Sequence, residues 1–450
     1  RRFEMFRFPG GLYSDVRIED VFKTDISVTL DRLDNMKEQR YRAAFIRVFD
    51  GRRWYYSSTT DIESIQRELE RLAGLSSPDP NINNNKVVKT FEINKGSFLN
   101  FSGSKDISKT ALKEKMDLLS QYFPHLKVSE PIKFWRGQYI DQRVVKSFYS
   151  SKGSALEFDY QRVGFRLSYQ MSLGEEKFMD RYDLAGNDIS PLKDRGREVQ
   201  ERVKGSEHFL KNATTVKPGK YTVVLSPEAA GVFAHESFGH KSEADFMLGD
   251  ETMMREWSIG KKVGSDVLSI IDNGNHPGVG FVSFDDEGTR ARETYLIKDG
   301  YLTGRLHSVE TAAALGEQPT GNARAVNFEY EPIVRMTTTY ISPGELTFDE
   351  LLEGIETGIY VGSLNHGSGM STFTLAPNQA FMIRSGKIAE PVRISVISGS
   401  VFQTLNEIEG ITRDSKILSF SLGGCGKMEQ YPLPVGFGGP YVRVRSLNVQ

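Results

Sequence analysis

Residues 226–245 read SPEAAGVFAHESFGHKSEAD, and the rest of the chain is organised around this stretch. Ser226 and the proline after it predict the start of a helix, because a serine oxygen can cap free backbone N–H groups and proline suits the first helical position. His235, Glu236 and His240 follow inside the predicted helix as an HExxxH motif. Two imidazoles beside a carboxylate can bind a divalent metal ion while the carboxylate acts on water.

The spacing of the two histidines does not fit a regular α-helix. Each helical residue turns by about 100°, so residues at i and i+5 are roughly 500° apart, which leaves their side chains about 140° from each other. Both nitrogens of a zinc site must nevertheless lie about 2.0–2.1 Å from the ion. A one-residue π-bulge would bring His235 and His240 onto one side, and Gly239 lowers the cost of such an irregularity. The motif therefore predicts a bulged helix.

A two-histidine site needs a third ligand and an open position for water. The chain has a single cysteine, Cys425, which lies in the glycine-rich sequence GGCGK. A lone thiol is often a small buried hydrophobe, but this segment has no apolar run to bury it. Glu243, about one helical turn beyond His240, is the alternative ligand. The residues favour Cys425 and leave Glu243 open.

Length and charge limit the class of protein. With 450 residues the chain exceeds one hydrophobic core, so two or three domains are expected. The net charge is −2 at pH 7 and the lysines and arginines are scattered, which argues against a nucleic-acid partner. The sequence has no apolar run near the ~18 residues that a membrane helix requires, so no membrane partner is expected either.

The cysteine count bears on localisation. One cysteine rules out an internal disulfide and fits a reducing compartment, so we expect a cytoplasmic protein. The sequence begins at Arg1 and not at methionine, so an export signal cleaved upstream stays open.

Strand, helix and turn patterns predict a mixed α+β fold. Residues 86–93 have the pattern of a strand, and residues 133–182 have that of a meander of β-hairpins. A polar stretch that ends near Lys217 closes the first half. We therefore expect an N-terminal α/β domain over residues 1–217 and a second domain over residues 218–450.

The second domain is expected to be a large antiparallel β-sheet or barrel-like domain that carries the HExxxH helix. Asp299-Gly300, between two short apolar runs, is the strongest hairpin signal in the chain. Thr347 begins a T-x-x-E capping box at the start of a short helix. The acidic triplet 285–287 precedes a glycine, which favours a solvated turn over a metal-binding cluster.

Seven sequence blocks between His235 and Lys427 resemble one known family. In order they read HESFGHKSEADF, FDDEGTRARETYLIKDGYLTG, TGNARA, EPIVRMTTTYISPGE, GIYVGS, FMIRSGKI and GGCGK. Together they resemble the TldD/PmbA metallopeptidase family, and specifically its TldD-type branch, which keeps HExxxH and the late cysteine. The resemblance spans most of the C-terminal half in many separate blocks, so it is highly specific.

The resemblance implies a zinc-dependent metallopeptidase. His235 and His240 match the zinc-binding histidines of the family, Glu236 matches its catalytic glutamate, and Cys425 matches its third zinc ligand. Glu243 is then left as a group that supports a ligand. The implied substrates are unfolded or flexible peptides, with Glu236 as general base and acid for water activated by Zn²⁺.

The resemblance also implies an assembly. Chains of the TldD type form a homodimer, or a heterodimer with a PmbA-type subunit that lacks the metal motif. A catalytically idle peptide-binding or assembly subunit is the alternative function. A donor for the developing oxyanion is needed as well. His366, Tyr340 and Arg335 are candidates, and the sequence does not choose among them.

Overall fold

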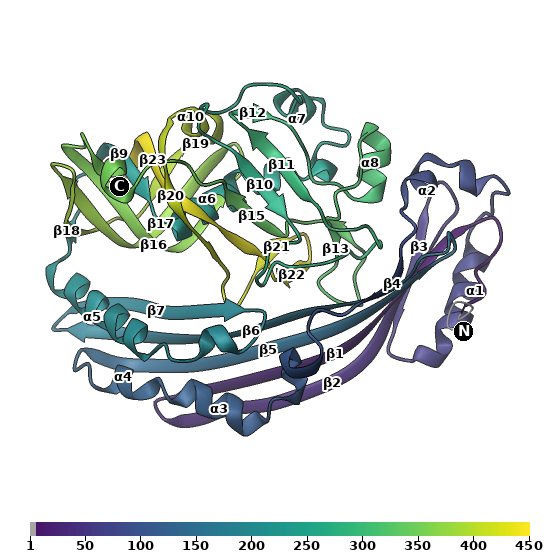
Figure 1. Cartoon of the computed structure of the whole chain (residues 1–450), viewed down its shortest axis with the longest axis horizontal. Coiled ribbons are helices and arrows are strands. Elements are labelled where there is room, and N and C mark those ends of the chain that lie inside the picture. Colours follow the sequence, from purple (N-terminus) through teal and green to yellow (C-terminus); the bar gives the residue numbers. More distant parts are fainter. Residues whose placement is uncertain (1–5) are drawn as a thin grey trace.

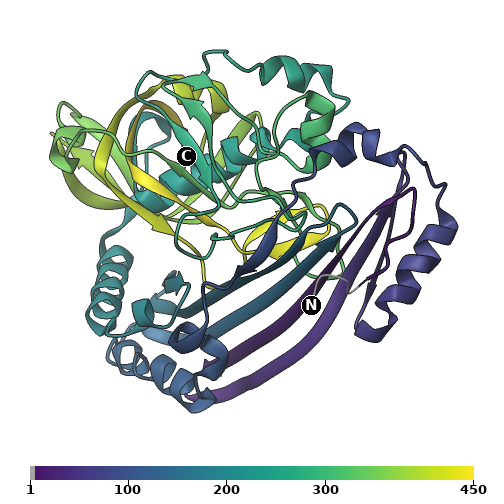
Figure 2. The ribbon, with the colours of Figure 1, turned by 45° about the vertical axis from the view of Figure 1, so that its right-hand side comes forward.

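The computed structural model describes residues 6–450; Arg1, with which the sequence begins, lies outside the described residues. Two large sheets dominate the molecule (Figure 1). Figure 2 shows the long strands of the first sheet running beneath the second half of the chain. Helices and strands are both abundant, which confirms the predicted α+β class. Within residues 6–450, no helix combines the length and apolar composition needed to cross a membrane.

The first sheet has seven strands in the order β3-β2-β1-β5-β6-β4, with β7 paired to β6. They are β1 (Tyr13–Thr29), β2 (Arg32–Phe49), β3 (Trp54–Thr59), β4 (Lys95–Phe98), β5 (Ile132–Ser150), β6 (Ala155–Leu173) and β7 (Glu176–Gly186). All neighbouring pairs are antiparallel except β4 with β6. β5, β6 and β7 form the meander that the sequence predicted over residues 133–182.

The two faces of this sheet have different partners. The helices on one face are α3 (Leu112–Ser120), α4 (Phe123–Lys127) and α5 (Gly196–Asn212). Successive side chains of a strand point to opposite faces, so the odd-numbered and even-numbered residues of β5 lie on different faces of the sheet. Trp135 and Tyr139 pack in the core beneath the helices, whereas Lys146 and Phe148 contact the second half of the chain. The sheet therefore serves as a platform between its own helices and the second half.

Residues 86–93, predicted as a strand, begin instead with a helix. Two helices lie at the end of the first sheet that carries β3 (Figure 1): α1 (Ile65–Leu75) and α2 (Lys86–Thr90). The side chain of Asn85 accepts a hydrogen bond from the backbone N–H of Val87 at 2.9 Å and so caps α2. Val88 is buried in a cluster with Phe91. The strand prediction was wrong because a local cap outweighed the β-branched residues.

The second sheet has twelve strands, ten of them in the order β12-β11-β10-β15-β23-β9-β16-β17-β18-β8. They are β8 (Thr214–Thr215), β9 (Gly219–Leu225), β10 (Ile270–Asn273), β11 (Glu293–Lys298), β12 (Tyr301–Leu302), β15 (Thr338–Ile341), β16 (Thr357–Gly369), β17 (Thr372–Arg384), β18 (Lys387–Arg393), β19 (Ile397–Ser400), β20 (Ile408–Leu418) and β23 (Gly436–Val449). Three parallel pairs, β15–β23, β9–β16 and β18–β8, interrupt the expected antiparallel order.

Smaller elements complete the second half. Two short hairpins pair β13 (Ala323–Arg324) with β14 (Ile333–Val334) and β21 (Cys425–Lys427) with β22 (Gln430–Leu433). The helices are α6 (Pro227–Phe233), α7 (Glu251–Glu256), α8 (Val309–Leu315), α9 (Phe348–Leu352) and α10 (Val401–Asn406). β8 already pairs with β18 before residue 218. The domain boundary between residues 217 and 218 stays a prediction.

Two local predictions for this half are confirmed. β11 and β12 pair across Asp299-Gly300, where both residues have positive φ. Thr347 caps α9, since its hydroxyl accepts a hydrogen bond from the N–H of Glu350 at 3.3 Å, and the Glu350 carboxylate accepts one from the N–H of Thr347 at 2.7 Å.

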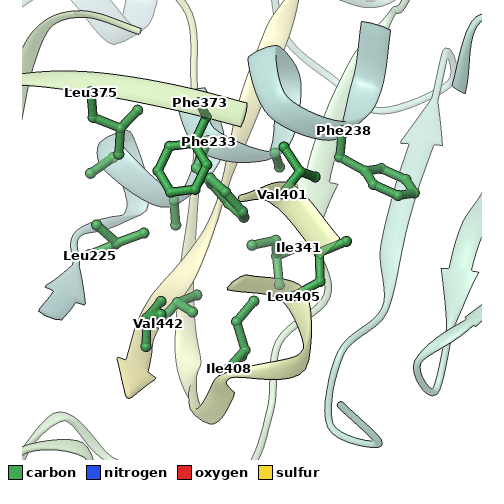
Figure 3. Close-up of a cluster of buried hydrophobic side chains, with 14 of the residues drawn as sticks. Leu225, Phe233, Phe238, Ile341, Phe373, Leu375, Val401, Leu405, Ile408 and Val442 are labelled. Atoms are coloured by element: carbon green, nitrogen blue, oxygen red, sulfur yellow. The ribbon is translucent and has the colours of Figure 1, made fainter. Parts of the chain in front are cut away.

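Helix α6 lies inside the core of the second half. It packs against strands β9, β15, β16, β17, β20 and β23. Phe233 and Phe238 are buried among apolar side chains of these strands, including Ile341 and Phe373 (Figure 3). A Cβ atom at Gly231 would overlap the backbone of β23, so glycine allows the helix to approach the sheet closely. This packing fixes the position of the residues that follow α6.

The acidic triplet 285–287 joins the two halves of the molecule. Lys146 of β5 lies 2.5 Å from a carboxylate oxygen of Asp286, and Arg47 of β2 lies 3.1 Å from one of Glu287. The carboxylates of the triplet are buried. The predicted solvated turn is therefore wrong, because basic residues distant in sequence supply the charge that water would otherwise screen.

Candidate metal centre

The predicted helix start is present at Ser226. Strand β9 ends at Leu225, and the Ser226 hydroxyl accepts a hydrogen bond from the N–H of Ala229 at 3.2 Å. Pro227 occupies the first helical position, where its missing N–H has no partner to lose. The HExxxH motif thus follows a capped helix that begins directly at a strand of the second sheet.

The helix is bulged where the sequence predicted it. Residues 234–239 form a π-helical segment, and a short 3₁₀ turn follows from His240. The i→i+5 hydrogen bonding of the segment offsets the extra residue between the histidines. The ring centroids of His235 and His240 lie 5.1 Å apart at an interplanar angle of 84°. The bulge therefore brings both imidazoles to one side.

Gly239 allows the bulge because it has no side chain. Its φ of −58° and ψ of −50° are ordinary helical values, so the positive-φ freedom of glycine is not used. A Cβ atom at this position would overlap the sulfur of Met336. The sequence identified the correct residue, but close packing against Met336 is the physical reason for it.

The β21–β22 hairpin carries Cys425 to the histidines. Gly424, just before the cysteine, has a φ of +157°, and a Cβ there would overlap the carbonyl of Leu433 in β22. Arg335 is fully buried behind the hairpin, and its guanidinium donates hydrogen bonds to the carbonyls of Cys425 at 2.8 Å and Gln430 at 3.3 Å. Glycines and one arginine therefore fix the cysteine backbone.

The structure brings the three predicted ligands close together. One possible ligand atom from each of His235, His240 and Cys425 lies within 4.8 Å of the others. The Cys425 sulfur is 3.5 Å from Nε2 of His240. Zinc bonds of about 2.3 Å to sulfur and about 2.05 Å to nitrogen at a tetrahedral angle separate these atoms by about 3.6 Å. Nδ1 of His235 is buried without a hydrogen-bond partner. The donor set therefore fits a metal ion such as zinc.

Glu243 lies behind one of the histidines. Its Oε1 is 2.5 Å from Nδ1 of His240, whereas Nε2 of the same ring faces the Cys425 sulfur. A carboxylate at the far nitrogen of a metal-binding histidine fixes the ring orientation and raises the basicity of the binding nitrogen. The geometry therefore separates the two residues that the spacing left open: Cys425 faces the histidines and Glu243 supports His240 from outside.

The close contacts within the trio shift the pKa of each member. Burial would raise the pKa of the Cys425 thiol, but the charge and hydrogen bonds of His235 and His240 lower it to about 5. Burial would lower the pKa of His240, yet its contacts with Cys425 and Glu243 raise that pKa to about 10. The pKa of His235 is raised for the same reason, chiefly by the charge of Cys425 against the effect of burial. Without metal the cysteine is thus held as a thiolate, the form that binds metals.

Glu236 faces a pocket beside the trio. Its side chain is 32% exposed, and its Oε2 lies 3.8 Å from Nε2 of His240. The pocket has a volume of about 70 Å³. It is lined by Val232, His235, Glu236, Phe420, Gly423, Gly424, Cys425, Pro434, Val435 and Phe437. A reactant in this pocket would meet the carboxylate of Glu236 together with His235 and Cys425.

The sequence candidates for an oxyanion donor do not line this pocket. Arg335 is committed to the carbonyls behind Cys425. Tyr340 is paired with the ring of His276 at a centroid distance of 5.5 Å, and His366 lies in the β16–β17 hairpin. The sequence missed the wall residues Phe420 and Phe437, since distant aromatic residues carry no spacing signal toward a helix motif.

Comparisons with known proteins find relatives over nearly the whole chain. The sequence profile described as PmbA/TldA metallopeptidase C-terminal domain matches residues 218–450, and that described as PmbA/TldA metallopeptidase domain 1 matches residues 14–76. A metalloprotease of Synechocystis is 34% identical over 97% of this chain and 94% of its own length. A zinc metalloprotease TldD homolog of Saccharolobus solfataricus is 31% identical over 98% of this chain and 97% of its own.

Two solved structures share the fold. A modulator of DNA gyrase from Thermotoga maritima has a TM-score of 0.80 at 19% identity, over 98% of this chain and 96% of that one. TldE from Thermococcus kodakarensis has a TM-score of 0.77 at 16% identity, over 97% of this chain and 96% of that one. The family profile and the sequence relatives define the chain as a metallopeptidase. It belongs to the TldD/PmbA family.

Proposed function

We propose that this metallopeptidase is of the TldD type and uses zinc to hydrolyse peptide bonds in unfolded or flexible peptides. The observation that carries the proposal is the approach of His235, His240 and Cys425 within 4.8 Å, with Glu236 in the adjoining pocket. When bound there, zinc supplies a Lewis acid that polarises the scissile carbonyl and acidifies water. One relative is named as a zinc metalloprotease, which supports this choice of metal.

Glu236 is the proposed proton carrier. Its carboxylate is partly exposed, so it can take a proton from the attacking water and later deliver it to the leaving amine. It lies 3.8 Å from Nε2 of His240, at the edge of the ligand set. The contact between Glu243 and Nδ1 of His240 fixes the imidazole ring. Nε2 therefore stays turned toward the site while Glu236 takes up and releases the proton.

The surroundings of the pocket support an extended substrate. A cavity of about 50 Å³ shares the wall residue Pro434 with the central pocket. A third and larger cavity, of about 300 Å³, shares Phe420 and Phe437 with it. A chain with its scissile bond at Glu236 would thus find room on the side of the third cavity.

A strand edge beside the third cavity supports binding through the peptide main chain. Lys416 and Leu418, at the end of β20, line this cavity and pair with β23 on their other side. An extended peptide added to this edge would bind through backbone hydrogen bonds, which demand little of its sequence. We therefore propose that unfolded chains are accepted broadly.

The test of the proposal is a comparison of Glu236→Gln with the unchanged protein. Removing a general acid–base group lowers turnover by about 10²–10⁴-fold, so cleavage of unfolded casein should fall by that factor. Zinc content, measured by elemental analysis, should be the same in both proteins. Glu251→Gln, an exposed carboxylate at the start of α7, is the matched control and should leave cleavage unchanged.

Each outcome identifies the part that fails. Zinc-loaded Glu236→Gln with full activity would overturn the role of Glu236. Purified protein without zinc after loading would overturn the metal. If the unchanged, zinc-loaded protein binds casein but does not cleave it, the idle peptide-binding or assembly subunit is the better description.

We further propose a dimer, either of two copies or with a PmbA-type subunit. The likeness of the fold to TldE supports such an assembly. Light scattering of the purified chain should give a dimer mass, or a monomer that becomes a dimer with the partner. A cytoplasmic location is likewise proposed, and cell fractionation tests it.

A further inference from the structure

A buried lysine lies behind the proposed metal ligands. Lys427 follows Cys425 by two residues on β21, and its side chain is 2% exposed. Its ammonium group lies 3.3 Å from Oε2 of Glu243, and it donates hydrogen bonds to both carboxylate oxygens of Asp245 at 2.8 and 2.7 Å. It also donates to the carbonyl of Val334 at 2.8 Å. All three donor positions of the ammonium group are therefore directed to oxygens.

These contacts continue the chain of residues that begins at the ligands. Cys425 faces Nε2 of His240, Nδ1 of that ring contacts Oε1 of Glu243, and Oε2 of Glu243 contacts Lys427. Lys427 lies on the same strand as Cys425, so the series of contacts ends where it began. The contacts form a closed loop between the segment after the histidines and the β21–β22 hairpin, two parts of the chain about 180 residues apart in sequence.

The charge balance gives Lys427 a specific task. Glu243 is fully buried, and a buried carboxylate without a compensating charge is strongly disfavoured. Lys427 supplies that charge on the side of Glu243 that faces away from His240. It thereby holds the Glu243 side chain in one rotamer, and the carboxylate in that position fixes the His240 ring.

We propose that Lys427 is a positioning residue that sets metal affinity by holding Glu243 against His240. The inference rests on the proposed zinc site, because it assigns a residue that supports one of its ligands. Lys427 touches neither the pocket nor a ligand side chain among its described contacts. Among these contacts Glu243 is the one that in turn contacts a proposed ligand, so we assign the effect of Lys427 to Glu243.

The experiment measures zinc affinity by competition with a chromophoric chelator. Loss of a residue that supports a metal ligand costs about 10–100-fold in affinity, and we expect Lys427→Met to weaken zinc binding by that factor. Glu243→Gln should have a similar effect. The double variant should bind no more weakly than Glu243→Gln alone, because residues that act through one contact are not additive. A merely structural lysine would not produce this coupling.

A second buried lysine provides the matched control. Lys115 of α3 is fully buried and paired with Asp141 at 2.8 Å, far from the trio in the first sheet. Lys115→Met should lower the Tm while leaving zinc affinity unchanged. Lys427→Gln keeps a donor for the Val334 carbonyl and replaces Lys427→Met if the latter does not fold; the same loss of affinity is expected.

Three results would be decisive. If the unchanged protein binds no zinc, both the proposed function and this inference are overturned. If the unchanged protein binds zinc and both Lys427 variants bind it equally well, the positioning role alone is overturned. Losses that multiply in the double variant would also overturn it, because Lys427 would then act independently of Glu243.

Discussion

The ammonium group of Lys146 lies 2.5 Å from a carboxylate oxygen of Asp286, an ion pair that ties the first sheet to the second half of the chain. Burial alone would raise the pKa of Asp286, but Lys146, Arg17 and a hydrogen bond from the N–H of Ala325 lower it below the ordinary value of 3.8. A carboxyl whose pKa is depressed by folding stabilises the protein above its unfolded pKa, and this contribution is lost as the pH falls through the folded value.

Asp286→Asn should therefore destabilise the protein in a pH-dependent way. At pH 7 the free energy of unfolding should fall by about 3–5 kcal/mol, the cost of breaking a buried ion pair. The difference from the unchanged protein should shrink as the pH drops from 3.8 toward the lower folded pKa of Asp286, since protonation of the carboxyl then removes its charge from the ion pair. Urea unfolding at several pH values measures this.

An exposed pair provides the control for that series. Asp266 is 81% exposed and paired with Lys262, so Asp266→Asn should cost less than about 1 kcal/mol at any pH. An Asp286→Asn effect of constant size from pH 7 to pH 3 would contradict the linkage.

Arg47→Met should be among the most damaging changes at the junction of the two halves. The guanidinium lies 3.0 Å from Asp15 and 3.1 Å from Glu287, and all three side chains are buried. Its loss leaves two buried carboxylates without their ion-pair partner, at a cost of about 3–5 kcal/mol measured by chemical denaturation. Arg42→Met, at an exposed pair with Asp20, should cost less than about 1 kcal/mol.

Gly239→Ala should disturb the π-helical segment. The added methyl group would overlap the sulfur of Met336, and such overpacking costs about 1–3 kcal/mol. Zinc affinity should fall with it, because the segment sets the positions of both histidines. Gly205→Ala in α5 meets open space in a helix interior and should stabilise the protein by about 0.5–1 kcal/mol. Equal effects of both changes in thermal unfolding would refute the packing argument.

Cys425→Ser should abolish tight metal binding. A serine hydroxyl is not ionised near pH 7, so the loss in zinc affinity should exceed the ~100-fold that removal of a supporting residue costs. Zinc should raise the Tm of the unchanged protein and leave that of Cys425→Ser unaffected, because binding to the native state alone stabilises it. Glu236→Gln should keep the zinc-dependent rise. A full rise in Cys425→Ser would show that the sulfur is not a ligand.

The sequence predicted local structure correctly where a few neighbouring residues determine the backbone. The i, i+5 spacing of His235 and His240 demanded an irregular helix, and the structure has one at residues 234–239. Turn and capping residues such as Asp299-Gly300 and Thr347 placed a hairpin and a helix start correctly. These predictions succeeded because backbone geometry over a few residues decides them.

The errors arose where distant residues compete with local pattern. The triplet 285–287 looked solvated because its counter-charges, Arg47 and Lys146, lie more than 130 residues earlier in the sequence. Gly239 was assigned conformational freedom, whereas its neighbour Met336 is nearly 100 residues away. Lys427 stood within the quoted GGCGK block, but nothing in its spacing pointed to Glu243.

The sequence by itself determined the family, the helix that carries two histidines and a glutamate, and the cysteine that could join them, because these follow from residue types and short spacings. The tertiary structure alone decided which groups lie behind the proposed ligands and what holds the two halves together. Buried charges must find partners wherever the fold brings them, and the chain order does not record those encounters.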